Sequence, residues 1–161
     1  MNRHETFVQT HILSLIRPSR PCDIRLDVLA EKIGMKIKTD EFSFCYQDQK
    51  TRYVVLDSSV DDEAVLRHHL AHEICHHVAT TGNAWSMRPI QLQRLEADVE
   101  KMALYLLAPT CMLDKHINRW LTYSKRDAIY LISDTFLMPF YSSAERLRLW
   151  VRDHQLQDIL F

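Results

Sequence analysis

Glycine is scarce in this sequence, which contains only Gly34 and Gly82 among its 161 residues. The phosphate-binding loops of nucleotide-binding proteins need two or more closely spaced glycines, so nucleotide binding through such a loop is excluded. Because glycine is also among the residues that weaken helices most, its scarcity favours a mainly helical protein.

Long apolar runs and a charge excess are missing as well. No stretch approaches the roughly 18 to 20 apolar residues of a membrane span, and the N-terminal residues lack the apolar region of a signal peptide. The formal net charge of -1 gives no general attraction to nucleic acid. With 47% hydrophobic and 25% charged residues, the chain has the balance of a globular domain. We therefore expect a cytoplasmic protein that does not contact membranes.

The cysteines form no C-x-x-C pair of the kind that binds metals or carries redox chemistry. In a reducing compartment we expect four free thiols that are mostly buried. They are Cys22, Cys45, Cys75 and Cys111.

No repeat, low-complexity tract or Ser/Gly linker divides the chain, so we expect one domain over residues 1–161, with a core at 1–110 and a helical part at 111–161. Helical periodicity predicts helices at residues 3–16, 23–33, 61–80, 89–108, 111–121, 126–137 and 143–156. Shorter patterns predict strands at 35–39, 42–47 and 51–57, with a hairpin turn at 48–50. The expected fold class is α+β, mainly helical, with a small three-stranded antiparallel sheet.

Five of the nine histidines lie between residues 68 and 77, and they contain an H-E-x-x-H motif formed by His72, Glu73 and His76. On a helix, His72 and His76 are about 40° and one turn apart, so both imidazoles can reach one metal ion. Glu73 is not needed as a ligand and is free to accept a proton from water. The alternative is a solvated polar face of an amphipathic helix. Against it, apolar residues occupy most of the circumference, which is typical of a buried helix.

Glu96 is the candidate for the third ligand that a catalytic zinc site needs. On the predicted 89–108 helix it falls within the apolar arc, whereas Glu100 falls at the border of that arc. An unpaired carboxylate facing the core is costly, so a cation is expected to meet it. Either a metal ion or an arginine such as Arg67 can fill that role.

Two segments carry a resemblance to a known family. Residues 70–76 read L-A-H-E-I-C-H, and residues 96–109 read E-A-D-V-E-K-M-A-L-Y-L-L-A-P. The chain resembles the ImmA/IrrE-type zinc metallopeptidases, whose patterns are A-H-E-L-G-H and E-x-x-A-N-x-F-A-x-x-L-L-M-P. Cys75 stands where the family has glycine, which makes this chain a divergent member. The further departures are Val99, Glu100, Met102 and Ala108 in place of Ala, Asn, Phe and Met.

The resemblance implies a zincin-like metallopeptidase core, with His72, His76 and Glu96 as metal ligands and Glu73 as the general base. It also implies a protein substrate, namely a helix-turn-helix repressor of a mobile element or a stress response. Zn²⁺ suits the two imidazoles and one carboxylate, and Mn²⁺ or Fe²⁺ can also occupy such a set. The hairpin at 42–57 is our candidate for aligning an extended substrate as an added strand.

Several alternatives stay open at this point. A residue that stabilises the oxyanion is not assigned; the candidates are His68, His69, His77, Tyr53 and Tyr105. Residues 127–136 and 143–151 have the spacing of a helix-turn-helix, but residues 119–161 contain six basic and five acidic side chains. This net charge of +1 is small for a DNA-binding surface, and we expect no direct nucleic-acid binding. A metal-binding regulator without turnover, docking on a protein partner or on DNA, is the alternative function.

Overall fold

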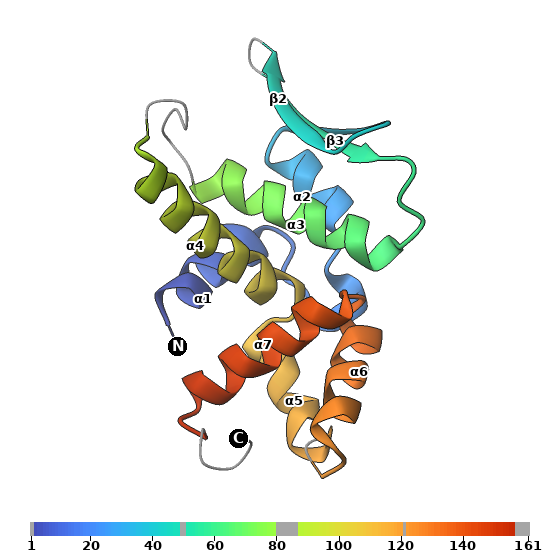
Figure 1. Cartoon of the computed structure of the whole chain (residues 1–161), viewed down its shortest axis with the longest axis vertical. Helices are drawn as coiled ribbons and strands as arrows, with labels where there is room; N and C mark the ends of the chain where they lie inside the picture. Colours follow the sequence, from blue (N-terminus) through green and yellow to red (C-terminus); the bar gives the residue numbers. More distant parts are fainter. Residues whose placement is uncertain (1, 49–50, 80–86, 121, 157–161) are drawn as a thin grey trace.

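The computed structural model describes residues 2–48, 51–79, 87–120 and 122–156. A small sheet lies against one side of helix α3, and the C-terminal helices lie on the other side of the molecule (Figure 1). None of the helices in these ranges is both long and apolar enough to cross a membrane. The helical elements are α1 (Arg3–Phe7), the π-helical η1 (Val8–Ile12), the 3₁₀ turns η2 (Leu13–Leu15) and η3 (Pro21–Asp23), α2 (Leu26–Lys32), α3 (Glu63–Ala79), α4 (Pro89–Leu107), α5 (Thr110–Trp120), α6 (Lys125–Phe136) and α7 (Phe140–Asp153). The strands are β1 (Met35–Asp40), β2 (Phe44–Asp48) and β3 (Thr51–Asp57).

The predicted elements correspond to these ranges, with differences at the ends. Gly34 has a φ of +77°, a left-handed conformation that suits the residue following a helix. Pro89 is the first residue of α4, where its missing N–H has no cost. The first predicted helix, at 3–16, is only partly α-helical, because its turns widen in η1 and tighten in η2. Residues 49–50 of the predicted turn, residue 80 of the third predicted helix and Gly82 lie outside the described residues.

The sheet is mixed, so the prediction of an antiparallel sheet is wrong. The strand order is β1-β3-β2, with β1 parallel and β2 antiparallel to β3. Val54 and Val55 point to opposite faces of β3, and both are buried. A strand that is buried on both faces is stabilised best at the centre of a sheet. The more exposed β1 and β2 therefore occupy the edges. The third strand in the sequence, β3, lies between the first two.

The thiols are less buried than expected. Cys75 is buried in α3 and Cys45 is partly buried in β2, but Cys22 and Cys111 are exposed, and all four are free.

Helices α3 and α4 pack side by side, and α4 is the central helix of the fold. Its C-terminal half is buried continuously from Met102 to Ala108. Helix α1 and η1 pack on α4, as does α7. The N-terminal half of α4 is more exposed and carries the polar residues that face α3.

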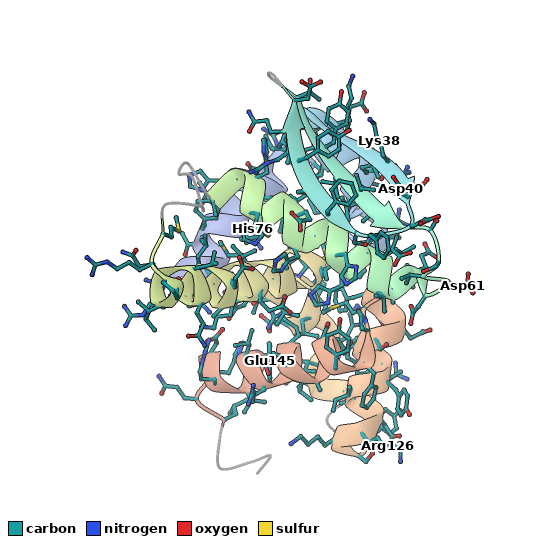
Figure 2. All side chains as sticks on the ribbon, turned by 45° about the horizontal axis from the view of Figure 1, so that its top comes forward. Lys38, Asp40, Asp61, His76, Arg126 and Glu145 are labelled. Atoms are coloured by element: carbon teal, nitrogen blue, oxygen red, sulfur yellow. The ribbon has the colours of Figure 1, made fainter. Side chains whose placement is uncertain are left out.

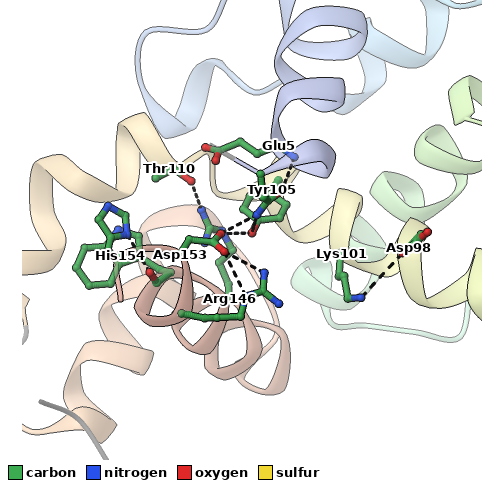
Figure 3. A network of polar contacts seen from close by, with 11 residues as sticks. Glu5, Asp98, Lys101, Tyr105, Thr110, Arg146, Asp153 and His154 are labelled. Atoms are coloured by element: carbon green, nitrogen blue, oxygen red, sulfur yellow. Dashed lines mark hydrogen bonds and ion pairs between the residues drawn. The ribbon is translucent and has the colours of Figure 1, made fainter. Parts of the chain in front are cut away.

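Helix α7 is attached to α4 through a buried polar network (Figure 3). The Arg146 side chain is fully buried, donates from Nε to the carbonyl of Ala108 at 2.8 Å and lies 4.5 Å above the Tyr105 ring. Burial, together with a hydrogen bond to Asp153, raises the pKa of Tyr105 to about 12, so its hydroxyl is a donor. Asn2 donates to the same Asp153 carboxylate at 2.7 Å. The network therefore connects the start of the chain with α4 and α7.

The buried half of α4 leads to a stability prediction. Replacing the fully buried Leu104 with alanine removes apolar contacts from the core, and we expect a loss of about 2–5 kcal/mol in the free energy of unfolding. Leu92→Ala on the exposed half of the same helix is the control, with an expected change below about 1 kcal/mol. Urea unfolding followed by circular dichroism measures both. Equal unfolding midpoints for the two variants would contradict this description of the core.

Candidate metal centre

Two rows of side chains face each other across the contact between α3 and α4. His68, His72 and His76 recur every four residues on α3, and Glu96 and Glu100 do so on α4. Residues four apart lie on one face of a helix, one turn above each other. His68 contacts Glu100 and His76 contacts Glu96, so the two helices run in opposite directions. His76 lies where α3 passes close to α4 (Figure 2).

His72, His76 and Glu96 form a group that can hold a metal ion, with one ligand atom from each within 4.8 Å of the others. Nε2 of His72 lies 3.4 Å from Oε2 of Glu96, and Nε2 of His76 lies 3.1 Å from that same oxygen. Ligands at about 2.0–2.1 Å from a tetrahedral zinc ion are about 3.3 Å apart, so these separations fit a cation between the three atoms. The Glu96 side chain is 46% exposed, so it borders an open site instead of facing the core.

The two ring nitrogens of His72 provide the second argument for a cation. Nδ1 of His72 lies 3.2 Å from Oε2 of Glu100, while Nε2 faces Glu96. Ionised carboxylates only accept hydrogen bonds, so both contacts can be satisfied without a cation only if the ring is doubly protonated. Burial lowers the pKa of His72, but the hydrogen bond to Glu100 and the nearby carboxylates raise it overall. A metal ion at Nε2 satisfies the same arrangement with a neutral ring.

Glu100 is a further candidate site residue, which the sequence pattern alone did not single out. Its Oε1 lies 3.0 Å from Nε2 of His68, and its Oε2 accepts from Nδ1 of His72. Burial alone raises the pKa of Glu100, but the hydrogen bonds from the two histidines lower it to about 2, so the carboxylate is ionised at neutral pH. A carboxylate on the far nitrogen of a ligating histidine fixes the ring's orientation. The sequence contained a signal for these contacts, because Glu100 is one helical turn from Glu96 and His68 is one turn from His72.

Glu73 lies beside this row, on the side of α3 that faces the sheet. Burial raises the pKa of the Cys45 thiol, and the nearby Glu73 carboxylate raises it further. Cys45 is paired with Val54, and both side chains are on the face of the sheet that packs against α3. The negative charge of Glu73 also acts on His72. The predicted general base thus lies between the edge strand β2 and the metal-ligand group.

Arg67, the cation considered as a partner of Glu96, donates instead to the carbonyl of Ile24 at 3.0 Å. The ion pair proposed as the alternative to a metal is therefore not formed.

The candidates for oxyanion stabilisation occupy different places. His68 is buried and bonded to Glu100, and Tyr105 is held by Asp153 in the α7 network. Tyr53 stacks with Tyr46 on the sheet. Nε2 of His77 contacts the Ile33 carbonyl, and Nδ1 of His69 is buried without a partner among the described residues. Among these five candidates, His68 is connected to the metal-ligand group indirectly, because Glu100 contacts both His68 and His72.

Comparisons with protein-family models, with curated proteins and with solved structures find no match to this chain. The resemblance to the ImmA/IrrE-type metallopeptidases therefore depends on the two motifs described above.

The geometry predicts one metal ion per chain. We expect the purified protein to bind about one equivalent of Zn²⁺ and His76→Ala to lose it, as measured by elemental analysis after dialysis. His116→Ala, which removes an exposed histidine on α5, is the control and should keep the metal. Free Zn²⁺ at a hundred times its Kd should stabilise the wild-type protein by about 2.7 kcal/mol. Equal metal content in the His76 and His116 variants would contradict the site.

Proposed function

We propose that this protein is a zinc-dependent metallopeptidase that hydrolyses peptide bonds. The observation that carries the proposal is the convergence of one ligand atom each from His72, His76 and Glu96 within 4.8 Å of one another, with a further carboxylate, Glu73, next to His72 on the same helix. Two imidazoles and one carboxylate leave room for a fourth, exchangeable ligand, which is the arrangement of catalytic zinc sites.

A divalent cation bound in this position supplies Lewis acidity, which polarises a carbonyl group and lowers the pKa of water. The protein residues have separate tasks. His72, His76 and Glu96 hold the cation, while Glu100 orients the His72 ring. Glu73 accepts the proton of the attacking water and then delivers it to the departing amine, as a general base that becomes a general acid.

The sheet supports an extended substrate beside this group. β2 is an edge strand, and Cys45 on its inner face contacts Glu73. An extended peptide that pairs with the free edge of β2 would lie along the side of α3 that carries the general base. This position of β2 supports the substrate-aligning role that we propose for the hairpin.

The substrate that we propose is a DNA-binding repressor of the helix-turn-helix class, to be cut so that repression is relieved. This choice comes from the family resemblance of the two motifs. From the sequence, which lacks long apolar runs, we also propose that the chain acts in the cytoplasm.

One observation favours a second function, that of a metal-binding regulator without turnover. The Glu73 carboxylate lies close enough to the Cys45 thiol to raise the pKa of that thiol, so the group that would accept the water proton has a thiol beside it. In this function, the metal holds α3 and α4 together for docking on a protein partner or on DNA.

Glu73→Gln tests the proposed mechanism. The amide keeps the size of the side chain but cannot accept a proton, so we expect cleavage of a repressor encoded beside this gene to fall by about 10²- to 10⁴-fold. Metal content should be unchanged, because Glu73 is not a ligand. Glu63→Gln, on the exposed first turn of α3, is the matched control and should cleave at the wild-type rate.

Cleavage by Glu73→Gln at the wild-type rate would refute the peptidase mechanism. A wild-type protein that binds zinc but cleaves no repressor would favour the regulator.

A further inference from the structure

A chain of polar contacts leads from the metal-ligand group to the C-terminal helix α7. The Ser142 hydroxyl on α7 lies 2.7 Å from Nδ1 of His68, and Nε2 of His68 lies 3.0 Å from Glu100. Glu100 in turn accepts from Nδ1 of His72 at 3.2 Å. Ser142 is 1% exposed and His68 is 4% exposed, so water does not compete for their contact.

The chemistry of these groups determines the direction of each hydrogen bond. The Glu100 carboxylate can only accept, so Nε2 of His68 and Nδ1 of His72 both carry the hydrogen that points at it. A neutral His68 ring with its hydrogen on Nε2 has a lone pair on Nδ1, and the Ser142 hydroxyl donates to it. With its hydrogen on Nδ1, the His72 ring presents the Nε2 lone pair towards His76 and Glu96.

We propose that Ser142 is a positioning residue for the metal ligand His72, acting through His68 and Glu100. The inference rests on the proposed metal centre and assigns α7 a part in building it. The Glu100 carboxylate fixes the His68 tautomer that carries its hydrogen on Nε2, and Ser142 holds that ring in place by donating to Nδ1. Glu100 in turn keeps the His72 ring in the tautomer and orientation that bind a cation.

Two neighbours of Ser142 on α7 allow a controlled experiment. Ser143 is also fully buried, but its hydroxyl donates to the carbonyl of Pro139 on its own helix. The Tyr141 hydroxyl lies 3.2 Å from Nδ1 of His68, which is longer than the Ser142 contact, and the Tyr141 side chain is exposed. Ser143→Ala therefore reproduces the loss of a buried serine hydroxyl without touching His68. Tyr141→Phe removes the second group able to donate to Nδ1.

The experiment titrates the full-length apo-protein with Zn²⁺ in competition with a chromophoric chelator. We expect Ser142→Ala to weaken zinc binding by about fivefold, the value of one ordinary hydrogen bond. Ser143→Ala should bind as the wild type does, and Ser142→Ala combined with Tyr141→Phe should bind more weakly than Ser142→Ala alone. Glu100→Gln removes the carboxylate next to His72 and should cause the largest loss, weakening zinc binding by about 10- to 100-fold.

Imidazole ¹⁵N spectra of the same proteins provide a readout that a packing role would not change. In the wild type, we expect His68 to be the Nε2–H tautomer with a hydrogen-bonded Nδ1, and in Ser142→Ala the Nδ1 resonance should move towards that of an imidazole nitrogen without a hydrogen bond. Ser142→Thr, which keeps the hydroxyl, should restore the wild-type pattern.

Failure of this inference can be told apart from failure of the proposed function. If the wild type binds zinc and Ser142→Ala matches Ser143→Ala in affinity and in the His68 spectrum, Ser142 has no positioning role and the metal centre stands. If the wild type does not bind zinc, or His76→Ala binds it equally well, both proposals are wrong.

Discussion

The candidate site depends on the contact between the histidine row of α3 and the glutamate row of α4. Each row repeats every four residues, so two helices that run in opposite directions bring the rows into register over two turns. Two carboxylates opposite three imidazoles leave negative charge in a partly closed space, which is costly unless a cation or protons neutralise it. The same two helices form the centre of the core, so the site is built on rigid elements and not on loops.

Much of the site could be predicted from the sequence, because helical spacing is a local property. The four-residue interval between His72 and His76 places both on one face without any knowledge of the tertiary structure. The same rule placed Glu96 on the side of its helix that meets another helix. It could not show that the helices are offset so that Glu100 reaches both His68 and His72. That offset depends on the packing of whole helices and on the connection between them. The position of Glu100 at the border of the apolar arc therefore did not indicate its contacts with His68 and His72.

The error in the sheet has a similar origin. Three short strands that follow one another suggest a meander, in which every neighbour in sequence is a neighbour in space. Val54 and Val55 are consecutive apolar residues, which indicates burial on both faces and so a central position. That signal was in the sequence, but the order β1-β3-β2 follows from it only when the helix beneath the sheet and the strand at each edge are considered together.

The buried Arg146 has a consequence for the sliding of α7. Ser142 and Arg146 are four residues apart and share one face of the helix, with His68 opposite the first and the carbonyl of Ala108 opposite the second. A slip of one turn, about 5.4 Å, would place the much longer Arg146 side chain at the position beside His68 that the short Ser142 side chain now occupies. The guanidinium would also lose the carbonyl of Ala108, to which its Nε now donates. Together, the Ser142 and Arg146 contacts therefore fix the position of helix α7 along its own axis.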